Sequence, residues 1–107
     1  MTDFALADLA RIIAERGRSG DPGSYTAKLI GAGVAKCAKK FGEEAVELAL
    51  ASVGGDKSAM AAESADVLYH LLVMLRARGI ALSEVEALLE TRTKKSGLEE
   101  KASRASK

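Results

Sequence analysis

Apolar residues recur every three or four positions along most of the chain, which is the spacing of one face of an α-helix. The pattern predicts five helices, over residues 4–15, 24–30, 34–53, 57–78 and 83–93. Ser24 is expected to cap the short second helix, and Ser83 with Glu86 forms a capping-box pattern at the start of the fifth. No stretch alternates in the manner of a strand. The chain is therefore expected to be all-α, a helical bundle of four to five helices.

Glycine and polar residues separate the expected helices. Residues 16–23 are polar and glycine-rich and include the single proline, so a loop is predicted there. Gly54 and Gly55 form a turn signal, and Asp56 is a favourable residue for the start of the next helix. Residues 94–107 are charged and lack apolar periodicity, which predicts a frayed helix end or a disordered tail. One domain over 1–93 and a charged tail over 94–107 are expected.

The expected fourth helix is apolar around much of its circumference, and its polar strip contains Glu63, Asp66 and His70. Such a helix is buried, either centrally or between subunits. A core built from 107 residues is small, so self-association would add stability. His70 lies one turn after Asp66 and is expected to be a hydrogen-bond partner or a packed residue rather than a metal ligand. Cys37 is expected in the core.

Acidic residues form two clusters with helical spacing, one on each side of the predicted turn. The clusters are Glu43, Glu44 and Glu47 in the third helix, and Glu63 and Asp66 in the fourth. If the chain folds back at the turn, the clusters lie at matching heights, because each residue adds about 1.5 Å of rise. Converging carboxylates repel one another unless a cation neutralises them. Oxygen ligands of this kind suit Mg²⁺, and magnesium on carboxylates usually accompanies a phosphate substrate.

Two lysines, Lys36 and Lys40, project from the third helix on nearly the same face as its acidic cluster. Lysines beside a metal site suit a phosphate chain, since they can hold the outer phosphates. The ordinary alternative is a solvated helix face on which Lys40 pairs with Glu44 and the acids bind nothing. The matched second cluster on an otherwise apolar helix favours the metal site.

Composition excludes several classes of function. The net charge is +1, with 16 basic and 15 acidic residues, which argues against nucleic-acid binding through bulk charge. One cysteine and one histidine cannot build a zinc site of the usual kind, and the lone cysteine indicates a reducing compartment. The N-terminus lacks the basic start of a signal peptide, and no apolar run is long enough to cross a membrane. A cytoplasmic protein is expected.

Several segments resemble a known family. The pattern Glu-Glu-x-x-Glu followed by Glu-x-x-Asp is similar to that of the all-α MazG-like nucleotide pyrophosphohydrolases. Within that superfamily, the flanking residues resemble the phosphoribosyl-ATP pyrophosphatases of histidine biosynthesis over about residues 4–93. The matching segments are Ser-Tyr-Thr-Ala-Lys-Leu at 24–29, Gly-Val-Ala-Lys at 33–36, Lys-Lys-Phe-Gly-Glu-Glu-Ala-Val-Glu at 39–47 and Glu-Ser-Ala-Asp-Val-Leu-Tyr-His-Leu-Leu-Val at 63–73.

The resemblance implies an enzyme that hydrolyses phosphoribosyl-ATP to phosphoribosyl-AMP and pyrophosphate with Mg²⁺, the second step of histidine biosynthesis. It implies metal ligation by Glu44, Glu47, Glu63 and Asp66, with Glu43 in a supporting role and Glu47 as a candidate base. Lys36 and Lys40 would stabilise the leaving pyrophosphate. The substrate end would be lined by Ser24, Tyr25, Thr26 and Lys28, which could equally cap and pack the short helix. The family is dimeric, and a functional link to phosphoribosyl-AMP cyclohydrolase follows.

Two other functions are compatible with the same residues. A related pyrophosphohydrolase acting on an ordinary or damaged nucleoside triphosphate would share the acidic clusters and differ in its base or sugar pocket. A helical module that oligomerises or binds a partner would carry the acids as surface residues and would show no response to Mg²⁺. A panel of nucleotide substrates separates the first alternative, and thermal stability with and without Mg²⁺ separates the second.

Overall fold

The structure, a computed structural model, describes residues 2–94, 101 and 104. Its helices are α1 (Leu6–Ser19), α2 (Tyr25–Ala32), α3 (Val34–Gly54), α4 (Lys57–Arg78) and α5 (Leu82–Thr93). No strand occurs among the described residues, so the predicted all-α fold is confirmed. The tail predicted over 94–107 falls mainly outside the described part of the chain.

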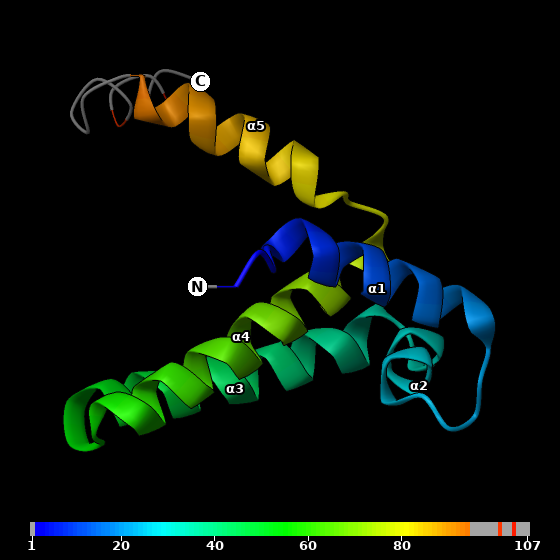
Figure 1. Cartoon of the computed structure of the whole chain (residues 1–107), viewed down its shortest axis with the longest axis horizontal. Helices are drawn as coiled ribbons and strands as arrows, with labels where there is room; N and C mark the ends of the chain where they lie inside the picture. The colour runs from blue at the N-terminus through cyan, green and yellow to red at the C-terminus, as the bar shows by residue number, and fades with distance from the viewer. Residues whose placement is uncertain (1, 95–100, 102–103, 105–107) are drawn as a thin grey trace.

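The two longest helices, α3 and α4, pack side by side as an antiparallel hairpin (Figure 1). Gly55 and Asp56 alone connect them. The Gly55 N–H donates to the Ala51 carbonyl at 2.9 Å, and a Cβ on Gly55 would lie 2.8 Å from that oxygen, so the close turn requires glycine. Asp56 caps α4, because its carboxylate accepts a hydrogen bond from the Ala59 N–H at 2.7 Å. A connection this short fixes the relative height of the two helices.

The buried core lies at one end of the hairpin, where α1 and α2 cover the C-terminal half of α4 and the start of α3 (Figure 1). It consists of Ile13, Leu29, Cys37, Leu72 and Val73. The Cys37 thiol donates to the Leu29 carbonyl at 3.2 Å, which satisfies it within this core and confirms the predicted burial of the cysteine. The core therefore anchors α1 and α2 beside the hairpin and leaves the hairpin's other end uncovered.

Helix α1 differs from the prediction at both ends. It begins at Leu6, where the Asp8 carboxylate accepts from the Ala5 N–H, and it continues to Ser19 instead of ending at residue 15. The predicted loop at 16–23 is therefore shorter. Gly17 lies inside the helix and does not break it. The absence of a side chain at Gly17 allows α2 to pack closely, since a Cβ there would lie 2.7 Å from the Ile30 side chain. The helix ends at Gly20, whose φ of 65° is the left-handed conformation that favours glycine.

The capping box predicted at Ser83 and Glu86 is wrong. Helix α5 begins one residue earlier, at Leu82, and the Glu84 carboxylate accepts a hydrogen bond from the Ala81 N–H at 2.8 Å. The start moves because an acid three residues after Ala81 can satisfy that free N–H without a hydroxyl at the cap. The other predicted cap is confirmed, since the Ser24 hydroxyl accepts from the Ala27 N–H at 3.1 Å.

Large apolar side chains remain exposed along the uncovered end of the hairpin and on α5. Val46, Leu50 and Val53 on α3 are 60%, 68% and 90% exposed, and no residue of α5 is buried. The radius of gyration is 16.1 Å, against about 13 Å for a compact domain of about 100 residues. None of the helices in the described residues combines the length and apolarity needed to cross a bilayer.

Replacing Asp56 tests the cap that sets the hairpin. We expect Asp56→Ala to lower the free energy of unfolding by about 1 kcal/mol, since it removes the acceptor for the Ala59 N–H. Asp56→Asn retains an acceptor and should change stability by only a few tenths of a kcal/mol. Thermal and urea denaturation at one protein concentration measure both. Equal midpoints for wild type and Asp56→Ala would show that the cap contributes nothing.

Candidate active site

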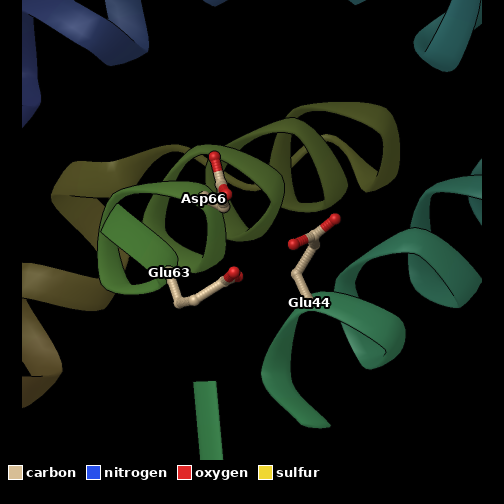
Figure 2. Close-up of side chains that lie close together, drawn as sticks. All are labelled: Glu44, Glu63 and Asp66. Carbon is tan, nitrogen blue, oxygen red and sulfur yellow. The ribbon is translucent and has the colours of Figure 1, made fainter. Parts of the chain in front are cut away.

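Three carboxylates from the two hairpin helices come together beside the α3–α4 interface. Glu44 projects from α3, and Glu63 and Asp66 project from α4 (Figure 2). One carboxylate oxygen from each lies within 4.8 Å of the others. Glu44 and Glu63 are half-buried and Asp66 is exposed, so the group opens to solvent on one side. The register predicted from the turn thus brings these three acids together, with the cluster less deeply buried than the apolar circumference of α4 suggested.

The carboxylate of Glu63 has the least favourable electrostatic surroundings of the three acids. Its Oε2 is buried and has no hydrogen-bond partner among the described residues. Burial raises the pKa of Glu63 above its ordinary value, and the neighbouring charges of Glu47, Asp66 and Glu44 raise it further. A buried, unpartnered carboxylate oxygen surrounded by other carboxylates is unfavourable without a compensating cation.

The other two predicted acids, Glu43 and Glu47, do not belong to the group of three. Glu47 lies next to Glu63, close enough to raise its pKa, but it is exposed and belongs to the edge of the cluster. Glu43 forms an ion pair with Lys40, with Oε1 3.5 Å from Nζ, and is not one of the three converging acids. Adjacent residues on a helix differ by about 100° in direction, so Glu43 and Glu44 cannot both face α4.

Lys40 connects the acidic cluster to the short helix α2. The pKa of Lys40 is raised above its ordinary value by electrostatic interaction, first with Tyr25 and then with Glu43, so Lys40 lies near both residues. Lys40 pairs with Glu43, not with Glu44 as the solvated-face alternative supposed, and Glu44 remains free of an ion pair in the described chain. Lys36 is exposed one turn earlier and forms no hydrogen bond or ion pair with any described residue.

The residues predicted for the substrate end divide into two groups. Ser24, Tyr25 and Thr26 line a cavity of about 370 Å³ between the end of α1, the start of α2 and Tyr69 of α4. Ser24 also caps α2, and buried Thr26 hydrogen-bonds the Tyr69 hydroxyl, so two of the three have structural contacts as well. Lys28 is exposed and does not line this cavity.

Known proteins are similar to this chain over nearly its whole length. A model of the family described as phosphoribosyl-ATP pyrophosphohydrolase matches residues 6–93. The chain belongs to this family. Phosphoribosyl-ATP pyrophosphatase 1 of Bradyrhizobium diazoefficiens is 58% identical over 104 residues, which cover 97% of this chain and 98% of that protein. Phosphoribosyl-ATP pyrophosphatase of Methylobacterium nodulans is 60% identical over 104 residues, covering 97% of each.

Membership of the phosphoribosyl-ATP pyrophosphohydrolase family confirms the predicted resemblance and the predicted enzyme class, a hydrolase. Relatives in Bradyrhizobium and Methylobacterium align over nearly their whole length, so the likeness is not confined to the acidic segments. No comparison assigns roles to individual residues, and the ligand set therefore stays a prediction that rests on geometry.

The donor set of this family member fits a hard divalent cation. Mg²⁺ prefers carboxylate oxygens and usually keeps several waters, so a site with one open side and three carboxylates suits it. The unpartnered Oε2 of Glu63 is the observation that carries the fit, because the described protein offers that oxygen no other compensation. His70 does not belong to the group: its ring lies edge-on to Tyr69 with centroids 5.0 Å apart, in agreement with the predicted packing role.

Sequence reasoning missed two residues beside the site, Arg16 and Tyr69. Arg16 was assigned to a loop, but it lies in the last turn of α1 and lines the same cavity as Tyr25. Tyr69 falls within the matched segment 63–73, and its ring stacks on Tyr25 with centroids 6.4 Å apart. The signal for Tyr69 was available, since it follows Asp66 by three residues and so lies on nearly the same side of α4.

We expect Mg²⁺ to raise the stability of the wild-type protein. We expect Glu63→Gln to raise the melting temperature without the metal and to reduce the stabilisation by Mg²⁺. In EDTA the neutral side chain relieves repulsion and should raise the melting temperature. With Mg²⁺ at a hundredfold excess over its Kd, wild type should gain about 2.7 kcal/mol, and the variant should gain less. Glu90→Gln, an exposed acid on α5, is the matched control. A wild-type melting temperature that ignores Mg²⁺ would contradict the metal site.

Proposed function

We propose that this chain hydrolyses phosphoribosyl-ATP to phosphoribosyl-AMP and pyrophosphate, with Mg²⁺ as its cofactor. Family membership supports the substrate, since its relatives in Bradyrhizobium and Methylobacterium are named phosphoribosyl-ATP pyrophosphatases. The single observation that supports the chemistry is the convergence of Glu44, Glu63 and Asp66 within 4.8 Å. Water attacks the anhydride between the α- and β-phosphates and breaks it, so the α-phosphate stays on phosphoribosyl-AMP and the β- and γ-phosphates leave together as pyrophosphate.

In this proposal Glu44, Glu63 and Asp66 hold the metal, and Glu47 completes the set from its place beside Glu63. When bound, Mg²⁺ supplies positive charge that neutralises phosphate oxygens and acidifies the attacking water. Glu47 is exposed, as is Asp66, and this exposure leaves one of the Glu47 oxygens accessible for accepting the proton of that water. Glu43 acts indirectly, by holding the ammonium group of Lys40 in position.

The lysines and α2 are assigned to the phosphates and to the rest of the substrate. Lys40 lies between the acidic cluster and Tyr25, where its ammonium group can neutralise the leaving pyrophosphate. Lys36 has no partner in the described chain and supplies a second positive charge on the same face of α3. Tyr25 and Thr26 lie at the cavity where the nucleotide end of the substrate would extend.

We also propose that the chain functions as a homodimer. Val46 and Leu50 lie on α3 within about 60° of Glu43 around the helix axis, so an apolar strip borders the acidic cluster. Both side chains are exposed, and exposed contiguous apolar surface marks an interaction site. A second copy seated on this strip would bury it and would narrow the open side of the cluster. The proposed oligomer therefore both stabilises the hairpin and completes the site.

The proposed product suggests a functional link to phosphoribosyl-AMP cyclohydrolase, because that enzyme would consume what this one releases. We place the reaction in the cytoplasm. The single cysteine supports this assignment, since Cys37 is a buried free thiol and free thiols persist in reducing compartments.

Release of pyrophosphate tests the proposed reaction. We expect release from phosphoribosyl-ATP with Mg²⁺, no release with EDTA, and a loss of about 10²- to 10⁴-fold in kcat for Glu47→Gln, the range expected when a general base is removed. Glu90→Gln should retain wild-type activity. Hydrolysis of deoxynucleoside triphosphates without hydrolysis of phosphoribosyl-ATP would refute the substrate and would favour the related pyrophosphohydrolase activity.

Sedimentation tests the proposed dimer. Wild type is expected to sediment as a dimer at micromolar concentration, and Leu50→Glu as a monomer, because a charge placed in the apolar strip cannot be buried there without a partner. Leu50→Met, which nearly conserves volume and apolarity, should remain dimeric. A monomeric wild type would contradict the proposal.

A further inference from the structure

The cavity beside α2 is lined by the guanidinium group of Arg16, which forms no ion pair with any described residue. Tyr25, Thr26 and Tyr69 line the same cavity. The one carboxylate in the lining, Asp21, is already engaged, since its Oδ1 accepts a hydrogen bond from the Gly23 N–H at 2.9 Å. An unpaired guanidinium at the wall of a cavity is suited to an anionic ligand, and planar guanidinium groups bind phosphate well.

Two hydroxyl groups add to the same wall. Thr26 and Tyr69 hydrogen-bond each other, and this bond uses one of their two hydroxyl hydrogens. The second hydrogen is available to a ligand. Burial raises the pKa of Tyr69, and Arg16 lies close enough to act in the opposite direction, which places the guanidinium and the phenol at the same end of the cavity. The cavity thus combines a positive charge with a neutral donor.

The cavity is separate from the acidic cluster but adjoins it. Tyr69 follows Asp66 by three residues on α4, a rise of about 4.5 Å and a rotation of about 60°. On the other side, the Tyr25 hydroxyl is close enough to Lys40 to raise its pKa. One extended ligand could therefore reach from the carboxylates, past Lys40 and Tyr25, to Arg16.

We propose that Arg16, with the hydroxyl pair of Thr26 and Tyr69, binds the ribose phosphate of the substrate at the end away from the triphosphate. This inference rests on the proposed function. It explains how an enzyme with a metal site for a triphosphate would distinguish phosphoribosyl-ATP from a plain nucleoside triphosphate. The added ribose carries a second anionic group, and Arg16 is an unpaired cation among the described residues that line the adjoining cavity.

Tyrosine fluorescence offers a direct test, because the chain contains two tyrosines and no tryptophan, and both tyrosines line this cavity. The probe is ribose 5-phosphate, titrated in EDTA so that the metal site takes no part. We expect a saturable fluorescence change with ribose 5-phosphate and none with ribose. Arg16→Gln should weaken the binding at least tenfold. Arg18→Gln is the matched control, since this arginine lies in the same turn of α1 and does not line the cavity.

Equal affinity in wild type and Arg16→Gln, equal weakening by Arg16→Gln and Arg18→Gln, or the absence of a saturable change would each overturn the inference. Circular dichroism verifies that both variants are folded. With phosphoribosyl-ATP as substrate, Arg16→Gln should raise KM about tenfold to a hundredfold with kcat nearly unchanged, the signature of lost uniform binding. A fall in kcat at constant KM would also overturn it.

The two proposals fail separately. A wild-type protein that binds ribose 5-phosphate through Arg16 but does not hydrolyse phosphoribosyl-ATP would refute the proposed function and keep this site. A protein that hydrolyses phosphoribosyl-ATP equally well with Arg16→Gln would keep the proposed function and refute the site.

Discussion

Antiparallel packing of α3 against α4 determines which carboxylates face one another. The connection consists of Gly55 and Asp56, and both are held in place, one by a close approach to Ala51 and the other by capping α4. Neither helix can therefore slide past the other by a turn, and Glu44 meets Glu63 and Asp66 at a fixed height. The favourable burial of Leu72 and Val73 against α1 and α2 provides the free energy that holds these like charges together.

The same constraint explains how much the sequence reveals. Helical spacing and the turn at 54–56 were sufficient to predict the hairpin and to place the two acidic clusters at matching heights, because both follow from residue counts along rigid helices. Residue counts could not decide between Glu43 and Glu44, since the direction of a side chain depends on the rotation of α3 against α4. Gly17 and Arg16 were misread for a related reason: the contact of Gly17 with Ile30 is tertiary, and no local pattern distinguishes such a glycine from a helix end.

In an isolated chain, the apolar strip on α3 is exposed to water directly beside charged carboxylates, which is unfavourable for the apolar side chains. Val46, Leu50 and Val53 need cover, while Glu43 and Glu47 on the adjacent face need solvent or a cation. A second copy can cover the apolar strip and leave the carboxylates accessible only if the interface stops at the carboxylates. The acids would then line the rim of the interface. The open side of the cluster would then become a cleft between subunits, and cleft formation would lower the local dielectric around a bound phosphate chain.

Chemistry and specificity depend on different parts of this fold. The carboxylates belong to the hairpin, whose register tolerates no shift. The lining of the Arg16 cavity comes mostly from the end of α1, the connection to α2 and the start of α2, and the hairpin contributes Tyr69. Residues 20–24 can change in length or sequence without altering the height at which Glu44 meets Glu63. Under the proposed function, the hairpin would keep the metal-dependent reaction while the α1–α2 connection adapts the cavity to a different nucleotide. Recognition of the ribose phosphate would then be gained or lost without disturbing the acidic cluster.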